Sequence, residues 1–144
     1  MSKIARTAAL AASAAAITVG TLAAPAHAAE VTSFSLSYGN ATLAGKNTWF
    51  DRSVTLEATH YLPSGTGNCR RVMLVAQNAD LATVDANSTS WKCGAGTYAV
   101  NLQVAHQVPG GPAYVQVYWQ EKDSATANTV RNIKSTWCNR TACY

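Results

Sequence analysis

The sequence predicts an all-β protein, an antiparallel two-sheet β-sandwich of immunoglobulin-like or jelly-roll-like type with seven to eight short strands and two disulfides. Three observations predict it. Beyond an N-terminal targeting segment, no stretch has the three-to-four-residue apolar period of an amphipathic helix. Short runs of alternating apolar and polar residues are separated instead by turn residues. The four cysteines, an even number, indicate a disulfide framework.

Residues 1–28 have the composition of a secretory signal peptide. Lys3 and Arg6 precede an Ala-rich apolar run that ends in Ala26-His27-Ala28, a typical cleavage pattern. We expect cleavage after Ala28, which leaves residues 29–144 as a single β-sandwich domain, secreted to the extracellular space and without membrane attachment. The segment resembles signal peptides of high-GC Gram-positive bacteria, which implies a bacterial protein.

The first half of the mature chain predicts two clear strands, one short strand and one central strand. Residues 31–38 alternate apolar residues with Ser, as in a strand exposed on one side. Residues 41–43 form at most a short strand before the break predicted at Gly45-Lys46-Asn47. Residues 53–61 alternate again, whereas residues 69–77 are apolar on both faces and predict a central, buried strand.

The second half predicts further strands joined by Gly-rich turns. Residues 81–84 and 88–93 form weak strands, and the last strand spans residues 129–137. Between them, residues 97–104 and 113–121 alternate strongly and flank a Pro/Gly-rich loop. We expect these two strands to pair as a hairpin.

The strand at residues 113–121 has one apolar face, which includes Trp119 and belongs in the core, and one face of Tyr and Gln. If residues 97–104 pair with it, two amide side chains join that second face. Tyr rings stack on sugar rings while amides bind hydroxyls, and Tyr is also common at protein interfaces. The predicted binding residues are Tyr114, Gln116, Tyr118, Gln120, Asn101 and Gln103.

The cysteines predict the bridges Cys69–Cys93 and Cys138–Cys143. Four cysteines allow three pairings, and pairs that are close in sequence form most readily. Zinc ribbons have two closely spaced cysteine pairs, which this sequence lacks. We therefore expect no metal and no cofactor.

The charge of the mature chain argues against nucleic acid as a partner. The net charge of +4 falls to +2 when Lys3 and Arg6 leave with the signal. The basic doublet Arg70-Arg71 lies in a predicted strand, where neighbouring side chains face opposite ways.

The sequence contains no motif of a hydrolase, such as G-x-S-x-G or H-E-x-x-H. The two histidines of the mature chain, His60 and His106, are assigned to the surface at a strand end and in a loop. Carboxylates for glycoside hydrolysis would come from Asp51, Glu57 or Glu121, but in a β protein sequence spacing does not reveal whether two of them share a groove. The prediction is a protein that is not an enzyme.

The leading functional prediction is a monomeric, non-catalytic binding module that recognises an extracellular polysaccharide or protein through an exposed sheet face. The alternative is a secreted protease inhibitor. The chain resembles bacterial subtilisin-inhibitor-like proteins in size and disulfide number, and the loop between Cys138 and Cys143 would then present Arg140 to a protease. A small secreted hydrolase is the third alternative.

Overall fold

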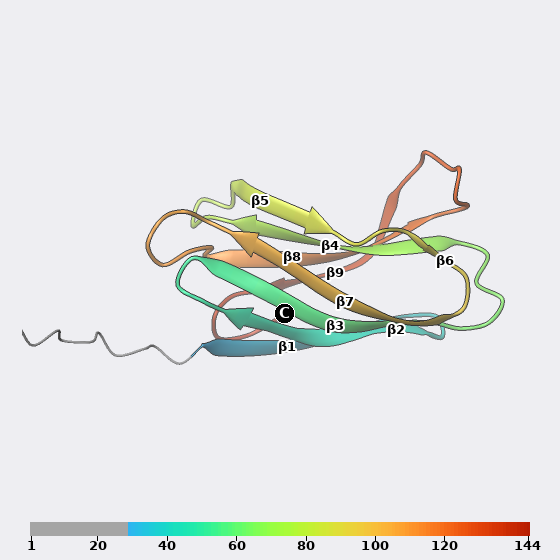
Figure 1. Ribbon diagram of the computed structural model, residues 1–144, viewed down its shortest axis with the longest axis horizontal. Coiled ribbons are helices and arrows are strands. Elements are labelled where there is room, and N and C mark those ends of the chain that lie inside the picture. The colour runs from blue at the N-terminus through green and yellow to red at the C-terminus, as the bar shows by residue number, and fades with distance from the viewer. Residues whose placement is uncertain (1–28) are drawn as a thin grey trace, which may run out of the picture.

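The computed structural model describes residues 29–144 as two antiparallel β-sheets packed face to face (Figure 1). Sheet A has the strand order β1-β2-β3-β7, and sheet B has the order β5-β4-β8-β9 with β6 paired to β4. The predicted signal peptide, residues 1–28, lies outside the described residues. The strands are β1 (Glu30–Tyr38), β2 (Ala41–Trp49), β3 (Ser53–Leu62), β4 (Cys69–Gln77), β5 (Thr83–Ser88), β6 (Lys92–Cys93), β7 (Gly96–Ala105), β8 (Tyr114–Lys122) and β9 (Arg131–Cys138).

The two-sheet sandwich and both predicted disulfides, Cys69–Cys93 and Cys138–Cys143, are confirmed. The described residues form nine strands where seven to eight were predicted, and β2 is much longer than the short strand expected at residues 41–43. The chain crosses between the sheets from β3 to β4 and from β7 to β8, while β3 pairs with β7 and β4 with β8. The two crossovers therefore interlock, because the strands they join pair with one another, β3 with β7 in sheet A and β4 with β8 in sheet B.

The prediction of a break at Gly45-Lys46-Asn47 is wrong, since β2 continues through it and pairs with β1 along its whole length. Gly45 is needed for packing between strands. A Cβ atom there would lie 2.4 Å from the Ala58 Cβ, so this glycine allows β2 and β3 to approach closely.

The predicted hairpin between residues 97–104 and 113–121 is also wrong. These segments become β7 and β8, which lie in different sheets (Figure 1). The Pro/Gly-rich loop between them is a crossover from sheet A to sheet B. Alternation identifies which side chains share a face of one strand, but it does not identify the neighbouring strand.

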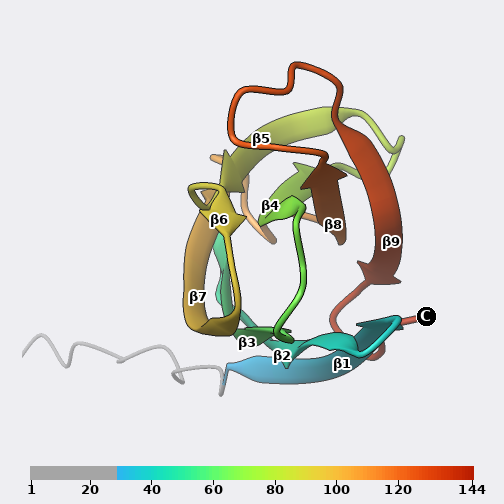
Figure 2. The ribbon, with the colours of Figure 1, turned by 90° about the vertical axis from the view of Figure 1, so that its right-hand side faces the viewer.

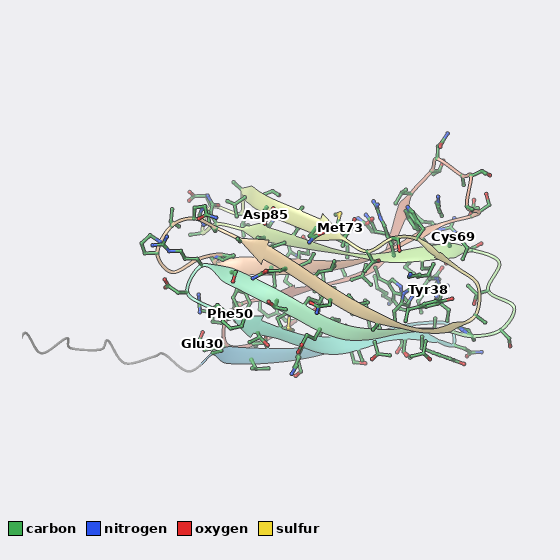
Figure 3. All side chains as sticks on the ribbon, viewed as in Figure 1. Glu30, Tyr38, Phe50, Cys69, Met73 and Asp85 are labelled. Carbon is green, nitrogen blue, oxygen red and sulfur yellow. A yellow bond between two sulfur atoms is a disulfide. The ribbon has the colours of Figure 1, made fainter. Side chains whose placement is uncertain are left out.

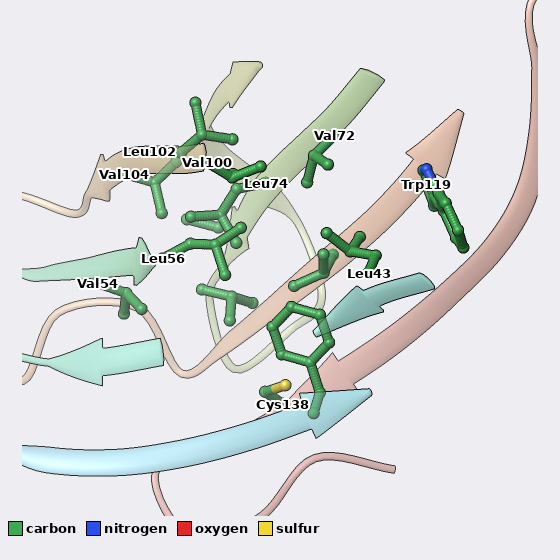
Figure 4. Packing of buried hydrophobic residues seen from close by; sticks show 14 of the residues in the cluster. Leu43, Val54, Leu56, Val72, Leu74, Val100, Leu102, Val104, Trp119 and Cys138 are labelled. Carbon is green, nitrogen blue, oxygen red and sulfur yellow. The ribbon is translucent and has the colours of Figure 1, made fainter. Parts of the chain in front are cut away.

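The core fills the space between the inner faces of the two sheets (Figure 4). The inward face predicted for β8 is confirmed, and Trp119 is completely buried. Trp49 closes the opposite end of the core, and its indole Nε1 donates a hydrogen bond to Thr32 Oγ1 at 3.0 Å. Buried aliphatic side chains between the two indoles are Leu43, Val54, Leu56, Val72, Leu74, Val100, Leu102, Val104, Val115 and Val117.

His60 lies inside the core, so the prediction of a surface position is wrong. It is 1% exposed and points inward from β3. The indole Nε1 of Trp119 donates a hydrogen bond to His60 Nε2 at 3.0 Å, so the two inner faces are joined by a polar contact. Burial first, and then the positive charge of Arg70, lower the pKa of His60 to about 4.

The edges of the two sheets curve toward each other (Figure 2). On one side β9 bends down toward β1. On the other side β5 approaches β7, where Ala105 N donates to Asp85 Oδ2 at 2.8 Å and Asn87 Nδ2 donates to the Gln103 carbonyl at 3.2 Å. Among residues 29–144 no helix is long and apolar enough to cross a bilayer.

Candidate functional site

The candidate site is the outer face of sheet B, which we call face B. The alternation of β8 turns Tyr114, Gln116, Tyr118 and Gln120 outward, as predicted, with β4 on one side and β9 on the other. Met73 of β4 lies on the same face (Figure 3). The face follows β8 from Tyr114 to Lys122, a length of roughly 26 Å at the usual rise per strand residue.

One end of face B carries an aromatic cleft formed by Leu81, Tyr114, Trp137 and Tyr144, with a volume of about 320 Å³. The rings of Tyr114 and Trp137 meet edge to face, with centroids 6.5 Å apart. Tyr144 is 68% exposed and Leu81 is 54% exposed. The cleft therefore presents apolar and aromatic surface to solvent on side chains from three separate segments.

Leu81 has an unusual backbone conformation, with φ at +62°, which is costly for a residue with a branched side chain. The turn formed by Asn78 holds it there. Asn78 Oδ1 accepts hydrogen bonds from Asp80 N and Ala82 N, and the Asn78 carbonyl accepts one from Leu81 N. Strain that exposes a leucine beside an aromatic cluster is typical of a functional position.

Face B contains two buried glutamines. Gln116 is 6% exposed and Gln120 is 7% exposed, so neither amide is free for a ligand. Tyr118 Oη donates to Gln116 Oε1 at 2.5 Å, while Gln120 Oε1 accepts from Arg71 Nε at 2.8 Å. The glutamines orient Tyr118 and Arg71, which is a positioning role.

The other end of face B is formed around Trp91, in the loop that joins β5 to β6. Arg71 Cζ lies 4.7 Å and Lys122 Nζ 4.9 Å from the centroid of a Trp91 ring, within cation–π range. Thr89, at the start of the same loop, exchanges hydrogen bonds with the backbone of Val72. The indole is therefore held beside the first residues of β4.

Beneath this end lies a buried ion network centred on Glu121, which is 1% exposed. Arg70 Nε donates to Glu121 Oε2 at 2.8 Å, and Arg131 Nη2 donates to Oε1 at 2.6 Å. Burial alone would raise the pKa of Glu121, but the hydrogen bonds from Arg131 and Arg70 outweigh it and hold the pKa below its ordinary value. The ionised Glu121 therefore links β8 to Arg70 of β4 and to Arg131 of β9.

Two predicted binding residues do not belong to face B. Asn101 and Gln103 were expected beside the tyrosines, but β7 pairs with β3 and places both on the outer face of sheet A. Gln103 Nε2 donates to Ser53 Oγ there, at 3.3 Å. The structure brings together four of the six predicted residues.

Arg140, which the inhibitor alternative would present to a protease, is engaged within the fold. Its Nη2 donates to the carbonyls of Phe50 and Gly110 at 2.9 and 2.7 Å, and its Nη1 lies 3.3 Å from Glu30 Oε2. The guanidinium also lies over the ring of Trp49. A side chain held by four contacts is poorly placed to enter a protease pocket, so the geometry counts against this role.

The three carboxylates considered for hydrolysis lie apart. Glu57 forms an exposed ion pair with Lys46 on sheet A, Asp51 lies in the turn after β2, and Glu121 is buried under face B. Within residues 29–144 no three His, Cys, Asp or Glu side chains form a group that could hold a metal ion.

Sequence reasoning missed most of the residues that give face B its character: Leu81, Trp137 and Tyr144 at one end, and Arg71, Trp91 and Lys122 at the other. Five of them belong to a weak strand, a loop or a strand end, where alternation gives no signal, whereas Arg71 lies in β4 and was considered only as part of a basic doublet. No protein family, curated protein or solved structure matches the chain.

Proposed function

We propose that residues 29–144 form a small, secreted, non-catalytic module that recognises an extracellular polysaccharide through face B. The observation that carries the proposal is the aromatic cleft at Leu81, Tyr114, Trp137 and Tyr144. Two disulfides in a chain of this size, typical of extracellular proteins, support secretion.

The cleft suits sugar rings because three of its four lining side chains are aromatic, and Tyr118 lies farther along β8 on the same face. Aromatic faces bind the apolar C–H side of a pyranose, while hydroxyl groups such as that of Tyr118 hydrogen-bond its edge. Tyr118 is held in place by Gln116, so little side-chain entropy is lost when a ligand binds.

An extended face favours a polymer over a small ligand. The aromatic cleft and Trp91 lie near opposite ends of β8, with Tyr118 between them. A polysaccharide chain lying along β8 would contact all three, and contacts that are individually weak would add along one chain.

The test is retention of the mature protein on insoluble polysaccharides such as chitin, cellulose and xylan, beside a set of secreted proteins. Replacing both Tyr114 and Tyr144 with Ala should reduce retention on the recognised polysaccharide about ten-fold or more, since each stacked ring contributes roughly 1 kcal/mol. The matched control is Tyr61→Ala, which removes a 42% exposed tyrosine from the outer face of sheet A and should change nothing.

Two further variants separate binding from folding. Leu81→Gly should weaken retention while the free energy of unfolding stays level or rises by up to about 1 kcal/mol, because Gly adopts positive φ without strain. Val117→Ala, in the core, should lower that free energy by roughly 1 to 3 kcal/mol and leave retention intact. Retention of a secreted protein but of no polysaccharide would replace the proposed ligand class.

A further inference from the structure

The positive charge of the described chain is concentrated at one end of sheet B. Residues 29–144 carry nine Lys/Arg and seven Asp/Glu. The register of four strands gathers six of those cations with only two of the acids, so this end has a net charge of +4 and the rest of the chain −2. We call it the basic end; its charged residues are Arg70, Arg71, Lys92, Lys122, Arg131, Lys134, Glu121 and Asp123.

Both acids of the basic end are already used. Glu121 pairs with Arg70 and Arg131, and Asp123 lies 3.1 Å from Arg131. For the other four cations, no carboxylate lies within 4.0 Å in the part of the chain that the structure describes. Cations in excess at one end of a weakly charged protein indicate an anionic partner.

Arg71 has the geometry of an anion-binding group. Its Nε donates to Gln120, and Gln120 Nε2 in turn donates to Asn132 Oδ1 at 2.9 Å, so a side-chain ladder across three strands fixes the guanidinium. Trp91 supports its face. Within residues 29–144 the two Nη groups have no hydrogen-bond partner, which leaves the fork that binds carboxylates in bidentate fashion.

We infer that the site formed by Arg71, Trp91 and Lys122 binds the carboxylate groups of an acidic polysaccharide, one built from uronic acids. The inference rests on the proposed function and names its ligand class. A planar carboxylate matches the Arg71 fork, and Lys122, on the adjoining strand, adds a second charge beside the same indole. The uronic acid would be held at this end of face B by its carboxylate, while the next sugars follow β8 toward the aromatic cleft.

The experiment compares polygalacturonate with its methyl ester, which has the same sugar rings but no charge. Affinity is measured by calorimetry with the mature protein at 50 and 300 mM salt. We expect at least ten-fold tighter binding of the acid form at low salt. Arg71→Gln should remove that preference, and Arg71→Lys should restore only part of it, because the charge returns without the fork.

The control is Lys46→Gln, which removes a cation from the outer face of sheet A and should leave both affinities unchanged. Equal affinity for the acid and the ester, unaltered by Arg71→Gln, would overturn the inference and leave the proposed function standing. Equally tight binding of single-stranded DNA would also overturn it, since any polyanion would then serve. Failure to bind either polymer or any neutral polysaccharide would remove the proposed function as well.

Discussion

The outer faces of the two sheets arise from the same alternation of residues, yet they carry different kinds of side chain. The outward positions of sheet A are mostly small: Ser33, Ser35, Ser37, Thr42, Ala44, Thr55, Thr59 and Ala99. Face B has three aromatic strand residues, Tyr114, Tyr118 and Trp137, and a cross-strand ladder of hydrogen-bonded polar side chains. Both faces are compatible with the same core.

The difference shows which features the sandwich requires and which it does not. Ser and Thr cover sheet A, and its one pair of oppositely charged side chains, Lys46 and Glu57, lies half exposed. Face B instead fixes Arg71, Gln120 and Tyr118 in place and strains Leu81. Ordering long side chains costs entropy that small side chains avoid, so face B is the costlier of the two outer faces to order.

The largest expected effect on stability comes from removing the disulfide on face B. Replacing Cys69 and Cys93 together with Ala should lower the free energy of unfolding by about 3 to 4 kcal/mol, because that bridge closes the longer loop. Opening Cys138–Cys143 should cost about 2 kcal/mol. Urea denaturation of both double variants measures the two losses. A larger loss for Cys138–Cys143 would show that stability is not concentrated under face B.

The second prediction concerns the contact between the inner faces at His60 and Trp119. The lowered pKa of His60, about 4, means that the unfolded chain binds this proton more readily. Stability is therefore full above about pH 6.5 and falls by roughly 3 kcal/mol as the pH drops toward 4. Denaturation midpoints between pH 4 and 8 measure the fall.

A pair of variants assigns that pH dependence to one residue. His60→Gln keeps a hydrogen-bond acceptor for Trp119 and cannot titrate, so its stability should change little between pH 6.5 and 4.5. His106→Gln, in the β7–β8 loop, should behave as the unaltered protein does. If His60→Gln retained the full pH dependence, another group would be responsible and the buried contact would be of little importance.

The smallest effect is expected on sheet A. Lys46→Gln breaks the ion pair with Glu57, whose side chains are 51% and 52% exposed. Solvent screens such pairs, so the free energy of unfolding should change by no more than about 0.5 kcal/mol. Thermal melts measure this directly. A decrease of 2 kcal/mol or more in the free energy of unfolding would show that the outer face of sheet A contributes substantially to stability. The contrast between the two outer faces would then be weaker.

The sequence correctly predicted the features that depend on residues close together in the chain, namely side-chain direction and disulfide pairing. Alternation correctly turned Trp119 inward and Tyr118 outward, and proximity in sequence correctly paired Cys69 with Cys93. These features follow from the two-residue period of a strand and from the ease of closing short loops.

The errors share a physical cause, which is that tertiary packing selects the neighbours of a strand. Nothing local at Gly45 shows that β3 presses against it, and nothing local at Asn101 shows that β7 crosses to sheet A. The basic end is likewise invisible in sequence. Arg71 and Lys122 lie in different strands, and only the register brings both charges beside Trp91.

The contacts of Arg140 also bear on when the sandwich can form. Its partner Glu30 precedes it by 110 residues, and the central pairs β3·β7 and β4·β8 likewise join distant segments. Such high contact order makes folding slow, and a chain that emerges from its N-terminus cannot complete either sheet until its later strands arrive. A nascent chain therefore cannot complete the sandwich until β7, β8 and β9 have been synthesised.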